Sequence, residues 1–181
     1  QKLWNVKILV TGGSGFIGSS LITELIKKHE IIAFDNGFRA GFENILSNSN
    51  VTLVKGDVTK KEDWAKLPTD VDFVYHLAAI NGTKYFYEIP SKVLEVNVRG
   101  TLNFVEWIKD TNAKQFFFAS SSEVYGFPKI FPTPETEPLT VPDPTNPRFS
   151  YSSSKIIGET IAINFAKSYG IDFIIGRFHN V

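Results

Sequence analysis

Residues 11–18 read TGGSGFIG and lie between the apolar run KILV at 7–10 and the segment SSLITELI at 19–26. The first flank is short, apolar and partly β-branched, which is typical of a buried strand. The second flank carries its apolar side chains at helical spacing. We therefore expect a strand, a glycine turn and a helix in direct succession.

The three spaced glycines suit a turn that holds a dinucleotide. Gly12 lets the chain reverse tightly, Gly15 lets the backbone approach a pyrophosphate without a Cβ, and Gly18 lets the helix pack close to the strand. The N-terminus of the helix would offer free N–H groups and a partial positive charge to the phosphates. The spacing is GxxGxxG rather than GxGxxG, and glycines alone also fit a plain turn.

Composition excludes several classes of function. The 181 residues are 43% hydrophobic, enough for one globular domain, and the 19 basic and 19 acidic residues cancel. No overall field would therefore recruit nucleic acid or an anionic membrane. There is no Cys, and the His residues are too scattered for a zinc site, so we expect no metal. Without a signal-like segment or a long apolar run, we expect a cytoplasmic protein with no membrane contact.

Strand-like and helix-like segments alternate along the chain. Further strands are expected at residues 30–34, 51–54, 71–79, 114–120 and 171–177, and helices at 60–67, 91–109 and from 151 onward. Residues 36–50 are polar and predict a loop with at most a short helix. This order predicts an α/β fold with a doubly wound parallel sheet of the Rossmann type, strand order 3-2-1-4-5-6.

An acid ends the second strand, as ribose recognition requires. Asp35 follows the glycines by about 20 residues, where a carboxylate accepts both ribose hydroxyls and repels a 2′-phosphate. NAD is therefore favoured over NADP. Arg39 keeps NADP as an alternative, and Asp35 could also be an exposed acid at a strand end.

Two positions after the third and fourth strands have open interpretations. Asp57 either accepts the adenine amine, with the Val58 backbone pairing to the ring, or caps the helix 60–67. The small Ala78 and Ala79 suit a sheet edge against which a dinucleotide lies. His76 is expected to be a hydrogen-bonded core histidine rather than a ligand or base.

Asn97 interrupts the buried stripe of the helix 91–109. An unpartnered buried amide costs on the order of 1–3 kcal/mol, so Asn97 must have hydrogen-bond partners. It either satisfies backbone groups locally or orders water and the lysine of an active site.

The end of the fifth strand and the following helix hold a candidate catalytic set. Residues 120–126 read SSSEVYG at a strand end, where ligands gather in such sheets, although turn chemistry would also use serines. Tyr151 and Lys155 are one helical turn apart. The ammonium, together with an oxidised nicotinamide, would lower the phenol pKa, so that Tyr151 moves a proton to or from an alcohol.

Seven of the nine prolines fall between residues 127 and 150. Such density excludes a helix or a central strand. A long loop in a compact domain is usually a lid or a binding loop, so we expect this segment to overhang the crevice.

Together these motifs resemble the extended short-chain dehydrogenases/reductases, and within them the NAD-dependent epimerase/dehydratase family acting on nucleotide sugars. The resemblance covers nearly the whole chain and is carried, in order, by residues 11–18, 56–57, 76–79, 97, 120–126, 151–155 and 177–180. It implies a nucleotide-diphosphate sugar as substrate, a transient keto sugar and an internal return of the hydride.

The resemblance also implies residue roles. Tyr151 would be the base and acid, Lys155 would hold the nicotinamide ribose, Ser121 would bind the reacting oxygen, and Asn97 would order the site. Glu123 would be a second catalytic group or a structural one. The implied NAD contacts are Gly12, Gly15, Phe16, Ile17, Gly18, Asp35, Asn36, Asp57, Val58, Leu77, Ala78, Ala79, Lys155 and Phe178. The implied substrate contacts are Ser121, Ser122, Tyr151 and Asn180.

Two departures from the family pattern bear on the reaction. Ser122-Glu123 stands where dehydratases of the dTDP-glucose type carry Asp-Glu, which puts the acid for water elimination in doubt and keeps a nucleotide-sugar decarboxylase open. The chain also stops where the sugar-binding lobe should begin and lacks an initiator Met, so we expect residues 1–181 to be an NAD-binding domain cut from a longer chain. The family implies a homodimer through helices 91–109 and 151–168.

Two classes of protein outside this reaction type share part of the pattern. An NADP-linked carbonyl reductase of the same superfamily would keep Ser121, Tyr151 and Lys155, although Asp35 argues against it. A redox-sensing regulator would keep the glycine turn without needing those three residues together.

Overall fold

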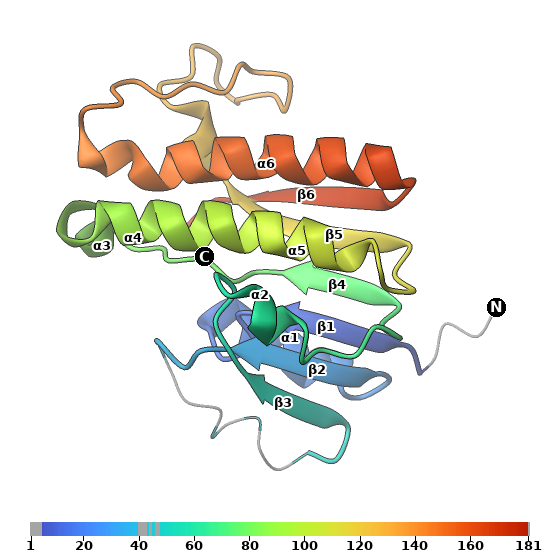
Figure 1. Ribbon diagram of the computed structural model, residues 1–181. Helices are drawn as coiled ribbons and strands as arrows, with labels where there is room; N and C mark the ends of the chain where they lie inside the picture. Colours follow the sequence, from blue (N-terminus) through green and yellow to red (C-terminus); the bar gives the residue numbers. More distant parts are fainter. Residues whose placement is uncertain (1–4, 40–42, 44, 46–47, 181) are drawn as a thin grey trace.

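The structure is a computed structural model that describes residues 5–39, 43, 45 and 48–180. Within these residues, six parallel strands form one sheet in the order β3-β2-β1-β4-β5-β6 (Figure 1). They are β1 Lys7–Thr11, β2 Glu30–Asp35, β3 Val51–Lys55, β4 Phe73–His76, β5 Gln115–Ser121 and β6 Asp172–Phe178. The predicted doubly wound sheet and its strand order are confirmed.

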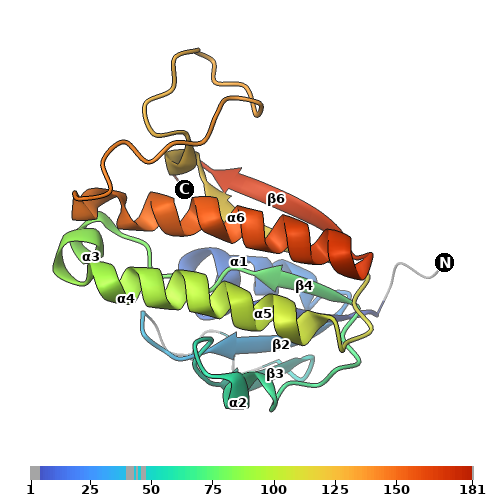
Figure 2. The same cartoon turned by 45° about the horizontal axis from the view of Figure 1, so that its top comes forward.

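Helices cover both faces of this sheet. They are α1 Phe16–Leu25, α2 Lys61–Trp64, α3 Thr83–Glu88, α4 Pro90–Leu94, α5 Gly100–Ile108 and α6 Ser150–Tyr169. A π-helical turn at Glu95–Arg99 joins α4 to α5, and short 3-10 turns occupy Ser122–Tyr125 and Pro147–Phe149. The α1 helix lies behind the sheet, whereas α2, α4–α5 and α6 lie in front of it (Figures 1 and 2).

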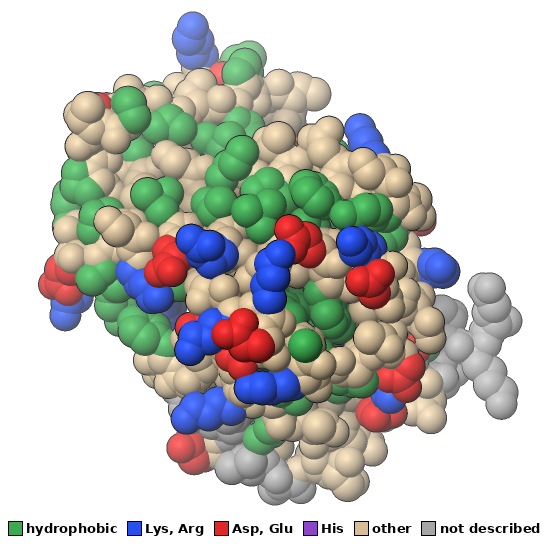
Figure 3. Space-filling view, in the orientation of Figure 1, with side chains coloured by type: hydrophobic (Ala, Val, Ile, Leu, Met, Phe, Trp, Pro, Cys, Tyr) green, Lys and Arg blue, Asp and Glu red, His purple; other side chains and the backbone are tan. Residues whose placement is uncertain are grey.

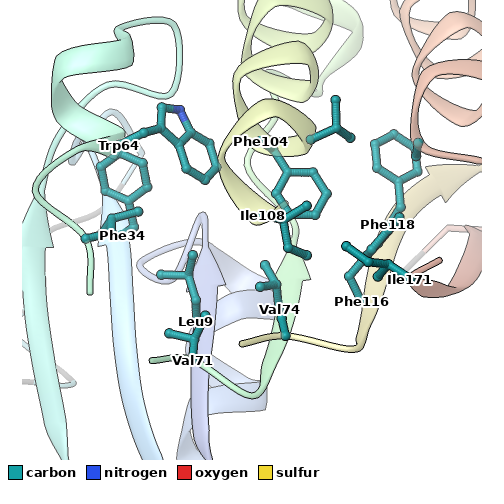
Figure 4. Packing of buried hydrophobic residues seen from close by; sticks show 14 of the residues in the cluster. Leu9, Phe34, Trp64, Val71, Val74, Phe104, Ile108, Phe116, Phe118 and Ile171 are labelled. Carbon is teal, nitrogen blue, oxygen red and sulfur yellow. The ribbon is translucent and has the colours of Figure 1, made fainter. Parts of the chain in front are cut away.

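Alternation along the strands sends side chains into two cores. Leu9 belongs to the larger core between the sheet and the front helices, and its neighbours Ile8 and Val10 pack on the α1 side. The larger core contains Phe104 and Phe116, stacked edge to face at 5.2 Å (Figure 4). Fully burying such a side chain contributes about 1.5–3 kcal/mol. The central strands are therefore apolar on both faces, which explains their unbroken hydrophobic runs.

The fourth strand is shorter than the predicted segment 71–79. Its pairing with β1 ends at the Thr11–His76 register, because β1 turns away into the glycine turn at Gly12. Beyond that point the Thr11 hydroxyl accepts the N–H groups of Leu77 and Ala78, each at 3.1 Å. The Leu77 N–H also donates to the Thr11 carbonyl at 3.2 Å. The ladder ends there, since the next N–H, that of Ala78, bonds the Thr11 side chain, and Leu77 starts a loop at the sheet edge.

Several other boundaries differ from expectation. The α1 helix begins at Phe16 rather than at residue 19, α2 is shorter than 60–67, and the α3 helix was not predicted. In the predicted loop 36–50, the described residues form no helix or strand, and residues 40–42, 44, 46 and 47 lie outside the described part. In the part of the chain that the structure describes, no helix has the length and hydrophobicity that a membrane crossing needs.

Candidate active site

A cleft of about 590 Å³ opens at the carboxyl ends of the strands. All six strands contribute to it at or just after their last residue, through Gly12, Asp35, Gly56, Leu77, Ser121 and Phe178. This edge is where ligands bind in open α/β sheets. Every residue that the sequence singled out for catalysis, cofactor or substrate lines the cleft, with the exception of Asn97.

The glycine turn has no room for side chains. A Cβ on Gly18 would collide with the carbonyl oxygen of Gly12, and a Cβ on Gly12 would lie 2.9 Å from the Ala78 nitrogen. Gly12 also has a φ of +71°, which glycine adopts without strain. Glycine is therefore required at Gly12 and Gly18 for the chain to pack this closely at the edge of the cleft.

Two polar features of the turn have no protein partner. No side chain caps the N-terminus of α1 at Gly15. The buried hydroxyl oxygen of Ser14, which lines the cleft, has no hydrogen-bond partner among the described residues. An uncapped helix N-terminus beside an unpartnered hydroxyl fits a pyrophosphate.

Asp35 faces this turn from the end of β2. Its carboxylate accepts the N–H of Ser14 at 3.0 Å and that of Gly37 at 2.7 Å. The acid is thus held beside the turn at the position that ribose recognition requires. The Arg39 guanidinium, which kept NADP open, lies 5.8 Å from the centre of the Tyr85 ring. Together with the uncapped turn, this carboxylate makes the residues fit NAD.

The capping role considered for Asp57 is wrong. Its carboxylate accepts the backbone N–H and the hydroxyl of Thr59, at 2.9 and 2.7 Å, and the cap position of α2 is Lys60. Both Asp57 and Val58 line the cleft. The Val58 carbonyl is already occupied, since it accepts the amide of Asn103 at 2.9 Å.

His76 is the core histidine that the sequence predicted. Its Nδ1 lies 2.8 Å from the Thr11 hydroxyl, and its ring stacks on Phe104 at 4.6 Å. Because the Thr11 oxygen already accepts two backbone N–H groups, its proton points to Nδ1. Burial, with a smaller effect of the Lys155 charge, lowers the pKa of His76 to about 3, so the ring is neutral.

Asn97 lies behind the cleft and satisfies backbone groups. Its side-chain oxygen accepts the N–H of Ile80 at 2.8 Å, and its nitrogen donates to the Ile80 carbonyl at 3.2 Å and to the Ser154 hydroxyl at 3.0 Å. These bonds show that Asn97 satisfies backbone groups, and its ordering of water and of the active-site lysine stays a prediction. Asn97 ties the loop after β4 to α6, next to Lys155.

Tyr151 and Lys155 are both buried on the first turns of α6, with the ammonium 5.8 Å from the centre of the Tyr151 ring. Burial lowers the pKa of Lys155 to about 8, against a smaller opposing effect of Glu159. Burial, followed by the charge of Glu123, raises the pKa of Tyr151 to about 12, while hydrogen bonding with Ser121 acts the other way. The predicted lowering of the phenol pKa is therefore not produced by this chain alone.

Glu123 forms an ion pair that the sequence analysis missed. Both of its carboxylate oxygens bond Arg148, at 2.8 and 3.0 Å, and its backbone N–H donates to the Ser121 hydroxyl at 3.2 Å. The two partners are 25 residues apart, so only the folded chain brings them together.

A second missed network fixes the ends of β5 and β6. Buried Glu159 accepts the Ser120 hydroxyl at 2.6 Å and the Nε and Nη2 groups of Arg177, each at 2.9 Å. Arg177 also donates to the hydroxyl of Tyr125 at 2.8 Å and to the carbonyl of Glu135 at 3.0 Å. Arg177 belongs to the motif at 177–180, but the sequence alone did not identify Glu159 and Tyr125 as its partners.

The proline-rich segment does not overhang the cleft as predicted. None of residues 127–149, all of them described, lines it. The segment rises beyond α6 and β6 instead (Figure 1). It is held there by Arg177 and by Thr140, whose N–H donates to the Val124 carbonyl at 3.1 Å. The expected absence of helix and central strand holds up to the 3-10 turn at Pro147–Phe149.

The chain is similar to characterised enzymes along almost its whole length. It is 35% identical over 181 residues to UDP-glucuronic acid decarboxylase 3 of Arabidopsis thaliana, covering 97% of this chain and 51% of that protein. A UDP-N-acetylglucosamine 4-epimerase from Methanobrevibacter ruminantium M1, solved with UDP-N-acetylmuramic acid, superimposes with a TM-score of 0.87 at 31% identity, covering 98% and 56%.

The UDP-glucose 4-epimerase of Thermus thermophilus, solved with NAD, gives a TM-score of 0.81 at 31% identity, covering 94% of this chain and 54% of that one. The chain thus spans about half the length of these relatives. The family model described as NAD dependent epimerase/dehydratase matches residues 8–181. The chain therefore belongs to the NAD-dependent epimerase/dehydratase family, as its motifs predicted, and NAD is the cofactor of that family.

Proposed function

We propose that residues 1–181 form the NAD-binding domain of a nucleotide-sugar epimerase/dehydratase that works through a transient keto sugar. The observation that carries the proposal is the sharing of one cleft by the uncapped glycine turn and by Ser121, Tyr151 and Lys155. A dinucleotide fold alone would not require a buried tyrosine and lysine one turn apart at the same strand ends.

The chain's own residues would bind and orient the reactants. The glycine turn and the N-terminus of α1 hold the pyrophosphate, Asp35 accepts the ribose hydroxyls, and Lys155 holds the nicotinamide ribose. NAD, when bound, accepts and returns a hydride and brings the positive charge of its oxidised ring. Asn180 and Ser122, which line the same cleft, contact the nucleotide-sugar substrate.

Tyr151 would move the proton of the reacting hydroxyl, and Ser121 would hydrogen-bond its oxygen. A phenol with a pKa of about 12 is a poor base at neutral pH, so proton removal needs additional positive charge near the Tyr151 oxygen. The Lys155 ammonium, whose pKa of about 8 leaves it charged at pH 7, is already present in the chain, so the additional charge must come from the bound oxidised cofactor.

Decarboxylation of a uronic sugar is the second candidate reaction. It is supported by Glu123, which lines the cleft directly after Ser121 and Ser122, and by the similarity to UDP-glucuronic acid decarboxylase 3. Loss of CO₂ from a sugar with a neighbouring ketone leaves a carbanion that an acid must protonate. The Glu123 carboxyl beside Ser121 would take a proton from water and deliver it to that carbon.

The proposed enzyme is a homodimer that associates through α4–α5 and α6. These helices lie side by side, and hydrophobic side chains gather over them (Figures 1 and 3). Leu94 and Ile157 on this face are 39% and 42% exposed. Sedimentation analysis of the chain and of an Ile157→Glu variant tests this, and identical behaviour as monomers would contradict it.

The test of the function is product analysis combined with cofactor accounting. The full-length protein is incubated with UDP-glucose, UDP-N-acetylglucosamine or UDP-glucuronic acid, and products are identified by NMR while net NAD reduction is followed. The proposal predicts conversion of one sugar without net change in NAD. Stoichiometric consumption of cofactor would indicate a carbonyl reductase, and NAD binding without any conversion would indicate a redox-sensing regulator.

A further inference from the structure

Glu123 lies at the cleft, and its carboxylate is hydrogen-bonded to a residue outside the cleft. Glu123 lines the cleft, whereas Arg148, which bonds both carboxylate oxygens, is a described residue that does not. Arg148 therefore contacts the cleft through residues that line it, Glu123 and Phe86.

Judged by its partial exposure alone, this ion pair would contribute little to stability. The side chains are 31% and 34% exposed, and an exposed pair contributes about 0–1 kcal/mol. Two features separate it from an ordinary surface pair. The contact is bidentate, which fixes the plane of the carboxylate as well as its distance. The guanidinium carbon also lies 5.4 Å from the centre of the Phe86 ring, and Phe86 is buried.

Phe86 links this ion pair to Tyr151. The two rings stack at 5.0 Å with an angle of 10° between their planes. The guanidinium is thereby held against the same buried ring that supports Tyr151, so it is fixed relative to that residue. Each carboxylate oxygen has a second lone pair, so the bidentate contact leaves Glu123 able to accept a proton.

We propose that Arg148 is a positioning residue that holds Glu123 as a fixed carboxylate base, next to the reacting oxygen site at Ser121 and Tyr151. This rests on the proposed function, because it requires the sugar ketone. In the step it supports, the C–H bond next to the ketone breaks and its proton passes to a Glu123 oxygen. The electron pair forms the enolate, whose negative oxygen accepts hydrogen bonds from the Ser121 and Tyr151 hydroxyls. The proton on Glu123 exchanges with water, and return of a proton from Glu123 to carbon restores the ketone.

The step is measurable as exchange of a sugar proton with deuterated water in the full-length protein. Arg148→Gln removes the bidentate partner, and we expect exchange to slow about 10²-fold, as for a misplaced catalytic group. Transient reduction of the bound dinucleotide, which reports sugar oxidation, should stay within a few-fold. Arg148→Lys keeps the charge without the planar fork and should restore exchange only in part. Lys27→Gln, which removes an exposed cation paired with Glu24 at 2.6 Å, is the matched control.

A double variant separates positioning from a general structural effect. If Arg148 acts through Glu123, then Arg148→Gln combined with Glu123→Gln exchanges no more slowly than Glu123→Gln alone. A urea-unfolding cycle on the same variants gives a readout without activity and should show coupling between the two residues.

The role of Arg148 would be overturned if the exchange rate of the double variant fell by the product of the two single-variant losses. It would also be overturned if Arg148→Gln left the exchange rate unchanged. In both cases sugar oxidation would remain intact. A parent protein that never reduces its dinucleotide in the presence of sugar would instead overturn the proposed function, and this proposal with it.

Discussion

The Lys155 ammonium donates a hydrogen bond of 2.7 Å to the carbonyl oxygen of Ala119, although the lysine is only 4% exposed. Ala119 lies near the end of β5, so this bond anchors α6 to the strand that leads to Ser121. The bond also keeps the Lys155 ammonium buried, and this burial makes the stability of the fold depend on pH.

Stability should rise with pH between about 8 and 10. The pKa of Lys155 is lowered to about 8 in the folded chain, against 10.5 when exposed. The unfolded chain therefore binds more protons in this window, and raising the pH favours folding by on the order of 2 kcal/mol. Above pH 10 the raised pKa of Tyr151 acts in the opposite sense. Urea unfolding at pH 8 and pH 10 measures the gain, and a Lys155→Met variant should lack it. If the free energy of unfolding changed equally with pH in the parent and in Lys155→Met, the assignment to Lys155 would be refuted.

Acidification should destabilise the chain through His76. Its pKa is about 3 in the folded chain, against 6.5 when exposed, so the unfolded chain takes up the proton first as the pH falls. Between pH 6.5 and 4.5 the expected loss is on the order of 2 kcal/mol. The acids with lowered pKa values, such as Asp63, titrate below 3.8 and do not act in this window. His76→Phe should remove the loss, and its persistence in that variant would point to another group.

Gly18→Ala should abolish most NAD binding. The new Cβ would meet the Gly12 carbonyl, and this backbone contact cannot move without opening the turn. Losing even one or two backbone contacts to the pyrophosphate corresponds to about tenfold or more in affinity. Gly170→Ala is the control for a general loss of stability, because its φ of +66° strains an added Cβ, while no described residue beyond its chain neighbours lies within 4 Å of that Cβ and Gly170 does not line the cleft. NAD titration calorimetry compares the variants, and equal affinity in Gly18→Ala would exclude the turn from the binding site.

Asp35→Ala should weaken NAD binding and narrow the preference for NAD over NADP. The change removes the ribose acceptor and the charge that repels a 2′-phosphate. It also frees the N–H of Ser14, so the turn loses a support. Titrations with both dinucleotides measure the preference. Asp72→Ala, directly before the amino end of β4, should leave the preference unchanged. A parent chain that binds NADP as well as NAD would contradict the assignment.

The sequence predicted the sheet and the location of the site because both depend on local patterns. Apolar runs marked each strand, the glycines marked the turn, and parallel strands bring their carboxyl ends to one edge. Thus Asp35, Ser121 and Tyr151, far apart in the chain, could be placed together before the structure was known.

What the sequence did not predict depends on tertiary partners. The end of β4 is set by a hydroxyl of β1, and nothing near His76 signals it. The pairs Glu123–Arg148 and Glu159–Arg177 join residues whose charges have no local relation. The raised pKa of Tyr151 follows from burial, and helical spacing with Lys155 does not report burial.

Tyr151→Phe shows whether the Tyr151 hydroxyl moves the proton of the sugar, because it keeps the ring stacked on Phe86 and removes only the hydroxyl. In the full-length protein, rapid mixing with the sugar nucleotide that it converts measures the rate at which bound NAD is reduced, and calorimetry measures NAD affinity. We predict unchanged NAD affinity and a rate lowered by about 10²–10⁴. A rate within a few-fold of the parent would show that another group moves the proton and would refute the role of Tyr151.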